Sequence, residues 1–400
     1  MNVRTGLRRL IHTMMTATHK TGRQRACVLG VALLVAFSAC THEVGLFASL
    51  EQEIPVDEGR GFPNEGSIHN LVKHDGRYFA GGASLWVRTA VDESATSLQG
   101  WTRIAPPTSA SRGTLDSMAL VNGDIYAVYD GNVYQRTANA DATAGAWNPV
   151  SEFNEDTAQR VFAVTVENGS LQNFVVSASV DGGNQLLDSD GEPVAELEAV
   201  NTIYAVLNFN DGTNDNIYVL TNSQVFQGDN DLGNFTDITA AVRGPATSTT
   251  FRDMQVRGSD DELWIAGRGR IYRFDGSDWT RTEEITPDDS STPVQFTSIA
   301  FVTVDGTEYV LAGTQSNGLY EGDDLDDLSS LRAEGSGRTL LGRDGNYLTT
   351  QMAGGAVSRI VVDQDGSARD STGPLVFVGA PGRGLWRGQP ENGGFIWRRE

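Results

Sequence analysis

The chain has 400 residues, of which 45 are glycine and 8% are aromatic, and its formal net charge is −22. An acidic chain of this kind repels phosphate backbones, so nucleic acid is excluded as an expected partner. The length suits a repeat array or two domains better than one small core.

The first 39 residues predict an export signal. They contain six cations and no acidic residue, and the stretch RQRACVLGVALLVAFSAC (23–40) places an apolar run from Val28 to Phe37 before small residues and a cysteine. This run is too short to span a bilayer as a stable helix, and it fits the apolar core of a signal peptide. We therefore predict a leader over residues 1–39.

The end of this leader, FSAC (37–40), resembles the lipobox of bacterial lipoproteins, with Phe37 where that family usually has Leu. The resemblance implies that the thiol of Cys40 is acylated by diacylglycerol and that Cys40 becomes the new N-terminus. Thr41, which is not Asp, implies sorting to the outer membrane, and it leaves the periplasmic and surface faces both open.

The alternative is a plain secretory signal that ends in a chance cysteine. Cys27 lies in the leader and no cysteine follows Cys40, so Cys40 has no disulfide partner in an exported protein. Lipidation is the better interpretation, and a multiply acylated terminus anchors a protein stably. Residues 40–66 then form a short linker behind the lipid anchor.

The rest of the chain repeats one pattern. The stretch DELWIAGRGRIYRFDGSDWTRT (261–282) holds three runs of strand-forming residues separated by two turns, and six other segments share that order. Their matched strand positions are 47, 49, 43, 46, 46 and 67 residues apart, the last interval containing a Gly- and Arg-rich insertion around residues 332–350: Phe79, Tyr126, Val175, Tyr218, Trp264, Val310 and Phe377.

Each unit also has an apolar run upstream, which gives four short strands per unit and no convincing helix. Units of four strands at this period predict an all-β, seven-bladed β-propeller over residues 67–400, with four antiparallel strands per blade. A parallel β-helix has shorter repeats, and a pair of β-sandwiches would not show this period.

Eight blades are the alternative if VGLFASLEQEIPV (44–56) belongs to a further blade. We expect this segment instead to close the ring by pairing with the C-terminal unit, whose last strand is FIWRRE (395–400). The recurring tryptophans are expected to pack between blades: Trp86, Trp101, Trp147, Trp264, Trp279, Trp386 and Trp397.

The stretch at 261–282 resembles the repeats of bacterial extracytoplasmic propellers, including sensor-type propellers with LWIGT-G-GLYRYDG-W patterns. The resemblance covers most of residues 67–400 and implies a blade rather than an activity. Propeller lipoproteins that assist outer-membrane assembly are a second point of likeness, although no motif ties the chain to them.

In a propeller, ligands usually meet the inner-strand ends at one mouth of the central channel. Aligning the first strand of each unit places seven residues there: His69, Asp116, Arg160, Thr202, Arg252, Thr297 and Ser358. Two residues later the alignment expects an apolar layer: Leu71, Met118, Phe162, Tyr204, Met254, Ile299 and Ile360.

The candidate ligand-binding residues at this mouth are therefore His69, Asp116, Arg160, Arg252, Asp253 and Arg359. Arg268, Arg270 and Arg383, in turns between second and third strands, suggest recognition of a carboxylate or sulfate, which guanidinium groups pair bidentately. The alternative is a water-filled channel whose arginines form salt bridges with the plentiful acids.

Metal and catalytic signals are weak. DQDG (363–366) and DSDG (188–191) resemble parts of a calcium loop but lack the full ligand series, and Asp-Gly pairs are ordinary turn signals. We expect no cofactor and no metal, with calcium as a remote alternative. No nucleophile, phosphate-loop or dinucleotide motif occurs, and no pair of carboxylates can be singled out for glycoside hydrolysis.

The sequence thus predicts a lipid-anchored propeller of the cell envelope that acts as a non-catalytic binding or scaffolding module. Its expected partners are the membrane, through the lipid, and envelope proteins or a polysaccharide. The alternative is an exported glycoside hydrolase or lyase that works at the channel mouth.

Overall fold

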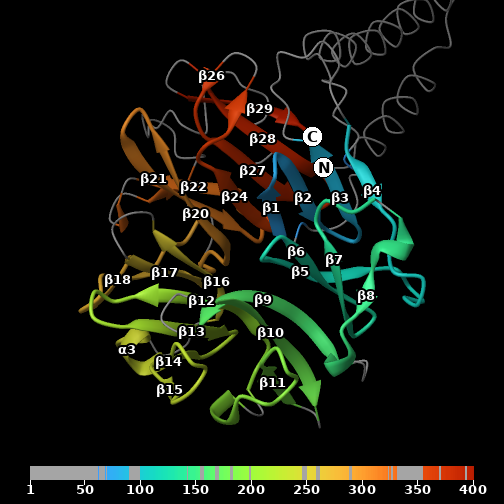
Figure 1. Ribbon diagram of the computed structural model, residues 1–400. Coiled ribbons are helices and arrows are strands. Elements are labelled where there is room, and N and C mark those ends of the chain that lie inside the picture. Colours follow the sequence, from blue (N-terminus) through green and yellow to red (C-terminus); the bar gives the residue numbers. More distant parts are fainter. Residues whose placement is uncertain are drawn as a thin grey trace, which may run out of the picture. The chain divides into compact units, whose positions relative to one another are not determined.

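The computed structural model describes Phe62, Ile68 and the chain from Asn70 to Glu400 with short gaps, at 90–99, 142, 154–156, 167–170, 181–182, 198–199, 246–249, 258–261, 288–290, 323, 326–327, 331–354, 369–370 and 392–393. The predicted leader, Cys40, His69, the segment 44–56 and the insertion around 332–350 lie outside the described residues. Within the unit that spans Glu58–Glu400, seven antiparallel sheets follow one another around a ring (Figure 1). The prediction of a seven-bladed β-propeller is confirmed.

Each blade begins with an inner strand that pairs with the second strand of the same blade. The inner strands are β1 (Asn70–His74), β5 (Leu115–Val121), β9 (Ala158–Val166), β12 (Ile203–Asn210), β16 (Phe251–Arg257), β20 (Phe296–Val304) and β24 (Arg359–Asp363). The second strands are β2 (Arg77–Gly81), β6 (Asp124–Tyr129), β10 (Leu171–Val180), β13 (Asp215–Thr221), β17 (Glu262–Gly267), β21 (Thr307–Thr314) and β27 (Leu375–Ala380).

Two further strands complete the blades toward the outside. The third strands are β3 (Leu85–Thr89), β7 (Asn132–Thr137), β11 (Gly183–Leu187), β14 (Val225–Asp229), β18 (Ile271–Phe274), β22 (Leu319–Gly322) and β28 (Gly384–Glu391). The outer strands are β4 (Thr102–Ile104), β8 (Asn148–Pro149), β15 (Thr236–Asp237), β19 (Trp279–Arg281), β23 (Ser329–Ser330) and β29 (Gly394–Arg399). In the third blade the described residues give three strands, and an isolated bridge between Asn184 and Val200 takes the outer position.

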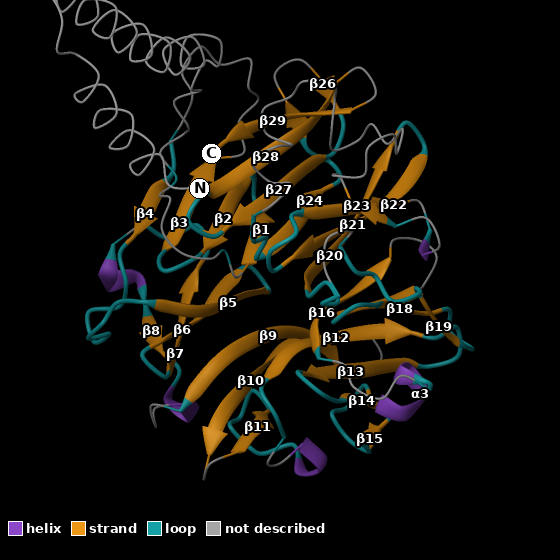
Figure 2. Ribbon diagram, turned by 180° about the vertical axis from the view of Figure 1, so that it is seen from behind, coloured by secondary structure: helices purple, strands orange, loops and turns teal. Residues whose placement is uncertain are grey.

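A hairpin, a short α-helix and three 3₁₀ helices (Ala144–Ala146, Ser151–Phe153 and Ala195–Leu197) stand outside this plan. A hairpin of β25 (Ser367–Ala368) and β26 (Ser371–Thr372) joins β24 to β27, and the helix α3 (Thr239–Arg243) follows β15 (Figure 2). The sequence analysis expected no helix. The two adjacent alanines, Ala240 and Ala241, favour one short turn of helix, which ends at Gly244 with φ of 56°. None of the helices among the described residues is long and apolar enough to cross a bilayer.

Two-residue turns explain why the inner hairpins form locally. Asp75-Gly76 joins β1 to β2, and both residues have positive φ, 44° and 69°. Asp305-Gly306 does the same between β20 and β21, at 51° and 80°. This geometry is that of the type I′ turn, whose twist matches the strands on either side and which Asp-Gly and Asn-Gly favour. The Asp-Gly pairs at these positions are therefore turn residues.

The core consists of seven separate apolar clusters, one between each pair of neighbouring blades. One cluster, for example, joins Phe79, Leu85 and Ile104 of the first blade to Met118 and Ile125 of the second. The other clusters join the remaining neighbours in turn, including the last blade to the first. Each sheet thus buries both faces, which explains the nearly continuous apolar runs in the second strands.

The expectation that tryptophans pack between blades is confirmed. Trp147 belongs to the cluster between the first and second blades and Trp397 to the cluster between the sixth and seventh, while Trp279 packs from the side against the cluster of the fourth and fifth. Buried arginines of the third strands support two of these rings: the Arg88 guanidinium carbon lies 5.3 Å from the Trp101 ring centre, and Arg136 lies 5.2 Å from Trp147. Such cation–π contacts strengthen packing that is already apolar.

Ring closure depends on a buried charged network between the last blade and the first. The Glu400 carboxylate, 1% exposed, lies 2.9 Å from Arg387 Nε and 3.1 Å from Arg88 Nη2, and it accepts a hydrogen bond of 3.1 Å from Trp101 Nε1. Phe62 covers the same interface and packs against Trp101 with ring centres 5.2 Å apart. The predicted last strand therefore closes the ring through side chains.

A second contact joins β24 to β1 and β2 across the same interface. The Asp363 carboxylate accepts hydrogen bonds from Lys73 Nζ, at 2.7 Å, and from the Tyr78 hydroxyl. Burial raises the pKa of Tyr78, and the bond to Asp363 raises it further. Tyr78 therefore stays a hydrogen-bond donor at neutral pH, and DQDG (363–366) contributes its first acid to ring closure.

Glu400→Gln should weaken the fold far more than the loss of a surface ion pair. The substitution keeps the shape of the side chain but leaves Arg88 and Arg387 buried without their counter-charge, which typically costs about 3–5 kcal/mol. The measurement is the free energy of unfolding in urea. Asp324→Asn is the control, because Asp324 is 59% exposed where it pairs with Arg273 and such pairs contribute below about 1 kcal/mol. Equal losses in the two variants would contradict a charged closure.

Candidate functional site

The inner strands enclose a cavity of about 780 Å³ at the centre of the propeller. All seven first strands approach one another around it, and β24 of the last blade contacts β1 of the first. A second cavity of about 790 Å³ lies along β16, β20 and β24 and shares Asn70 and Arg359 with the first. The two cavities therefore meet within one channel, and their volumes are those of sites that bind small molecules or a few sugar residues.

A β-bulge recurs near the start of the inner strands. In β5 the pairing with β6 skips Asp116, in β9 it skips Gln159, in β12 it skips Tyr204, in β16 it skips Arg252 and in β20 it skips Thr297. A bulge adds one unpaired residue and re-aims its side chain. In each of these five blades the bulge thus presents one side chain that is not needed for strand pairing.

Three of the residues aligned from the sequence, Asp116, Arg252 and Thr297, occupy this bulge. Two others are displaced: in the third blade Gln159 takes the position, next to Arg160, and in the fourth blade Tyr204 takes it, not Thr202. Tyr204 was expected in the apolar layer, and it lies instead at the cavity. In these blades the alignment chose a neighbouring polar residue, Arg160 or Thr202, although the buried Val161 and Val206 stand two positions after the bulge residue as in the other blades.

In three blades the residue after the bulge joins neighbouring inner strands. Ser117 Oγ accepts the Val161 N–H at 3.2 Å, Ser298 Oγ accepts the Ile360 N–H at 3.0 Å, and Asp253 Oδ2 accepts the Ile299 N–H at 2.9 Å. Asn70 Nδ2 donates to the Met118 carbonyl at 3.3 Å in the same manner. Buried backbone groups at the channel wall are satisfied in this way, and sequence reasoning missed the whole set except Asp253.

The residue one step further packs between the blades. It is buried in every blade: Leu71, Met118, Val161, Val206, Met254, Ile299 and Ile360. The predicted apolar layer therefore exists, with Val161 and Val206 in place of Phe162 and Tyr204. Phe162 is only half-buried and lines the cavity.

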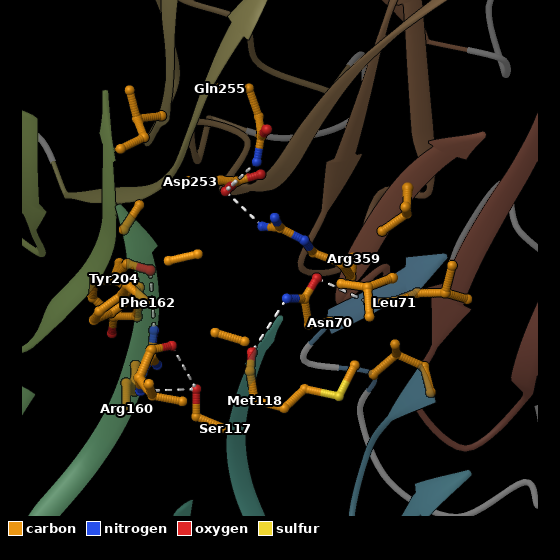
Figure 3. A pocket seen from close by; sticks show the side chains of 18 of the residues that line it. Asn70, Leu71, Ser117, Met118, Arg160, Phe162, Tyr204, Asp253, Gln255 and Arg359 are labelled. Carbon is orange, nitrogen blue, oxygen red and sulfur yellow. Dashed lines mark hydrogen bonds and ion pairs between the residues drawn. The ribbon is translucent and has the colours of Figure 1, made fainter. Parts of the chain in front are cut away.

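Asp253 is the best-connected acid of the channel. Arg359 Nη1 lies 2.6 Å from Asp253 Oδ1, across from the seventh blade to the fifth (Figure 3). Ser298 Oγ donates to Asp253 Oδ2 at 3.2 Å. Asp253 is 2% exposed. Its charge is balanced by Arg359, and both of its oxygens accept hydrogen bonds from the wall, so it joins three inner strands.

On another side of the cavity, two arginines approach one tyrosine, Tyr204; Figure 3 shows Tyr204 and one of these arginines, Arg160. The guanidinium carbons of Arg160 and Arg252 each lie 4.7 Å from the Tyr204 ring centre. Arg160 Nη1 donates to the Tyr204 carbonyl at 3.4 Å, and Arg252 Nη1 donates to the Tyr204 hydroxyl. Burial lowers the pKa of Arg160; Tyr204 opposes this, and the charges of Arg252 and Arg359 lower it further. The three cations are thus close enough to repel one another.

The other candidate residues are more peripheral. Asp116 is exposed at the cavity, and loss of surrounding water raises the pKa of its carboxyl, with Asp130 adding to the effect and Arg112 opposing it. Arg268, Arg270 and Arg383 do not line either cavity. The Asp188 carboxylate accepts the N–H groups of Asp190 and Glu192, each at 2.9 Å, which is an ordinary turn arrangement.

Comparison with solved structures shows the fold. No protein-family model and no curated protein matches the chain. The extracellular domain of a putative hybrid two-component system from B. thetaiotaomicron matches with a TM-score of 0.54 and 14% identity over 80% of this chain and 38% of that one. A second structure of that extracellular domain, described as a putative one-component system, gives 0.56 and 14% identity over 81% and 39%. The chain thus spans about two fifths of these relatives.

A third match is the β-propeller domain of Cps50 (Swd1) from Myceliophteria thermophila, with a TM-score of 0.50 and 13% identity over 85% of this chain and 98% of that domain. Identities this low establish a shared architecture and leave the site to be argued from its own residues.

Asp253→Ala should destabilise the protein, whereas Asp116→Ala should not. The first substitution leaves Arg359 without its counter-charge and the Ile299 N–H without its acceptor, a loss of about 3 kcal/mol. The second removes an exposed bulge residue, with an effect within about 0.5 kcal/mol. Thermal unfolding of both variants alongside the unaltered protein measures this difference. An unchanged melting temperature for Asp253→Ala would remove the structural role.

Proposed function

We propose that the chain is a lipid-anchored, non-catalytic binding module of the bacterial cell envelope, and that its ligand enters the central cavity. The observation that carries the binding role is that four of the bulge residues, Asp116, Tyr204, Arg252 and Thr297, line a cavity of about 780 Å³. These side chains are polar or aromatic, and strand pairing does not depend on them, so their identity can be determined by ligand recognition. Envelope proteins and polysaccharides are the partners that fit such a location.

Binding is better supported than catalysis because of the carboxylates. The lining of the 780 Å³ cavity includes two acids among the described residues, Asp116 and Asp253. Asp253 is held by Arg359 and by the Ser298 and Ile299 groups, so one acid remains where a glycoside hydrolase needs an acid and a second carboxylate. An exported hydrolase or lyase therefore stays the less favoured function.

The proposed envelope location is supported by the predicted leader and by the solved structures that share the fold. FSAC (37–40) resembles a lipobox, and the matched structures from B. thetaiotaomicron are described as extracellular domains. Both observations favour a location outside the cytoplasm. The lipid on Cys40 would hold the propeller at the outer membrane, on its periplasmic or its outer face.

The intact mass of the membrane-extracted protein tests this location. We expect a polypeptide that begins at Cys40 and carries a diacylglycerol and a further acyl chain, and we expect Cys40→Ser to appear in the soluble fraction. Protease treatment of whole cells then separates the two faces: cleavage places the propeller outside, and protection places it in the periplasm. An unmodified, soluble mass for the unaltered chain would refute the lipoprotein and favour a secreted protein.

A further inference from the structure

The cations of the central cavity are unevenly neutralised. Arg359 has the Asp253 carboxylate at 2.6 Å. Arg160 and Arg252 have instead a carbonyl, a hydroxyl and the face of Tyr204. Among the described residues, neither of these two guanidinium groups is recorded in an ion pair with a carboxylate, and yet the chain contains 52 acidic residues against 30 basic ones. Two arginines without a carboxylate partner in so acidic a protein indicate that an anionic ligand pairs with them.

The position of the two arginines fits one shared anion. Because each guanidinium carbon lies 4.7 Å from the same ring centre, the two carbons can be no more than twice that distance apart. The Tyr204 hydroxyl and carbonyl each take a hydrogen bond from one guanidinium, and a guanidinium has five N–H donors. Each arginine is therefore oriented by Tyr204 and retains donors for a ligand.

The side chains of this candidate site are also preorganised, since rigid strands position them before a ligand binds. Arg160 follows the bulge of β9, Tyr204 is the bulge of β12 and Arg252 is the bulge of β16. Three consecutive blades thus contribute one residue each from a rigid wall, and holding rotamers in advance reduces the entropy lost on binding.

We infer that the central cavity binds the oxyanion of an acidic ligand, a carboxylate or a sulfate group, between Arg160 and Arg252. This inference rests on the proposed binding function and names its ligand chemistry. Guanidinium groups pair both oxyanions through parallel hydrogen bonds. Phe162 and Gln255, which also line the cavity, supply an aromatic face and an amide for the remainder of the ligand, a combination suited to a uronic-acid or sulfated sugar.

Calorimetric titration of the purified propeller with three probes tests the inference: trigalacturonate, neutral galactotriose of the same linkage, and inorganic sulfate. We expect an anionic probe to bind and the neutral sugar to bind at least tenfold more weakly. Arg160→Gln and Arg252→Gln should each lower the affinity for the anion about tenfold or more, since hydrogen bonds to charged groups are the strong ones. Binding of trigalacturonate alone identifies a carboxylate source, and binding of sulfate identifies a sulfate source.

Arg103→Gln is the matched control. Arg103 is exposed on the outer strand β4 and bonds to Ser84, so the substitution removes the same charge away from the cavity and should leave the affinity unchanged. If Arg252→Gln fails to fold, Arg252→Lys keeps the charge and should bind the anion with a smaller loss.

Two results would overturn the inference. One is equal affinity for galactotriose and trigalacturonate that neither arginine variant alters. The other is the absence of heat with both anions at millimolar concentration. Neither result touches the lipid anchor, whose failure would be seen in the mass of the membrane-extracted protein.

Discussion

Face-to-face packing of each blade on the next is the constraint from which the other features follow. A four-stranded sheet with two apolar faces has no stable existence alone, so every blade requires both neighbours, and the first requires the last. Six of the interfaces join blades that are consecutive in the chain. The seventh must be assembled from residues as distant as Arg88 and Glu400. A buried charged network is costly to desolvate, so a wrong partner that left one of its charges unpaired would be strongly unfavourable. Such selectivity is useful at the interface between the last and the first blade, because chain connectivity does not bring these two blades together.

The closed ring fixes where chemistry can occur. Once the inner strands are held around an axis, the residue after the bulge satisfies an N–H group of the next strand in three blades, through Ser117, Asp253 and Ser298. The bulge residue itself has no such duty. Structural and recognition roles are therefore divided between adjacent positions of one strand, which allows Tyr204 or Arg252 to vary without loss of the fold.

The same division explains what the sequence could and could not predict. The second strands were aligned nearly without error: Tyr126, Val175, Tyr218 and Trp264 each pair with the third residue after the bulge, and only Val310 is one position off. Phe79 and Phe377 pair with the equivalent residues of β1 and β24, Val72 and Val361, where the register shows no bulge among the described residues. Their long apolar runs follow from burial on both faces. A bulge leaves no comparable pattern, because one unpaired residue shifts the alternation of faces by one. Tyr204 was accordingly placed among the apolar residues, and Gln159 was passed over for Arg160.

The local charge of the central cavity differs in sign from the net charge of the chain. The chain is strongly acidic, and a uniform negative field would keep an anionic ligand away. At physiological ionic strength, however, charges in solvent are screened within about 8 Å, so acids on the outer strands have little influence at the axis. Near the buried inner strands the effective dielectric is lower than in bulk solvent, and charges interact more strongly. Arg160, Arg252 and Arg359 already repel one another there, and a bound oxyanion would relieve that repulsion as well as pair with the donors. The sign of the ligand is therefore set by a few inner-strand residues, and the charge of the whole protein contributes chiefly to its solubility.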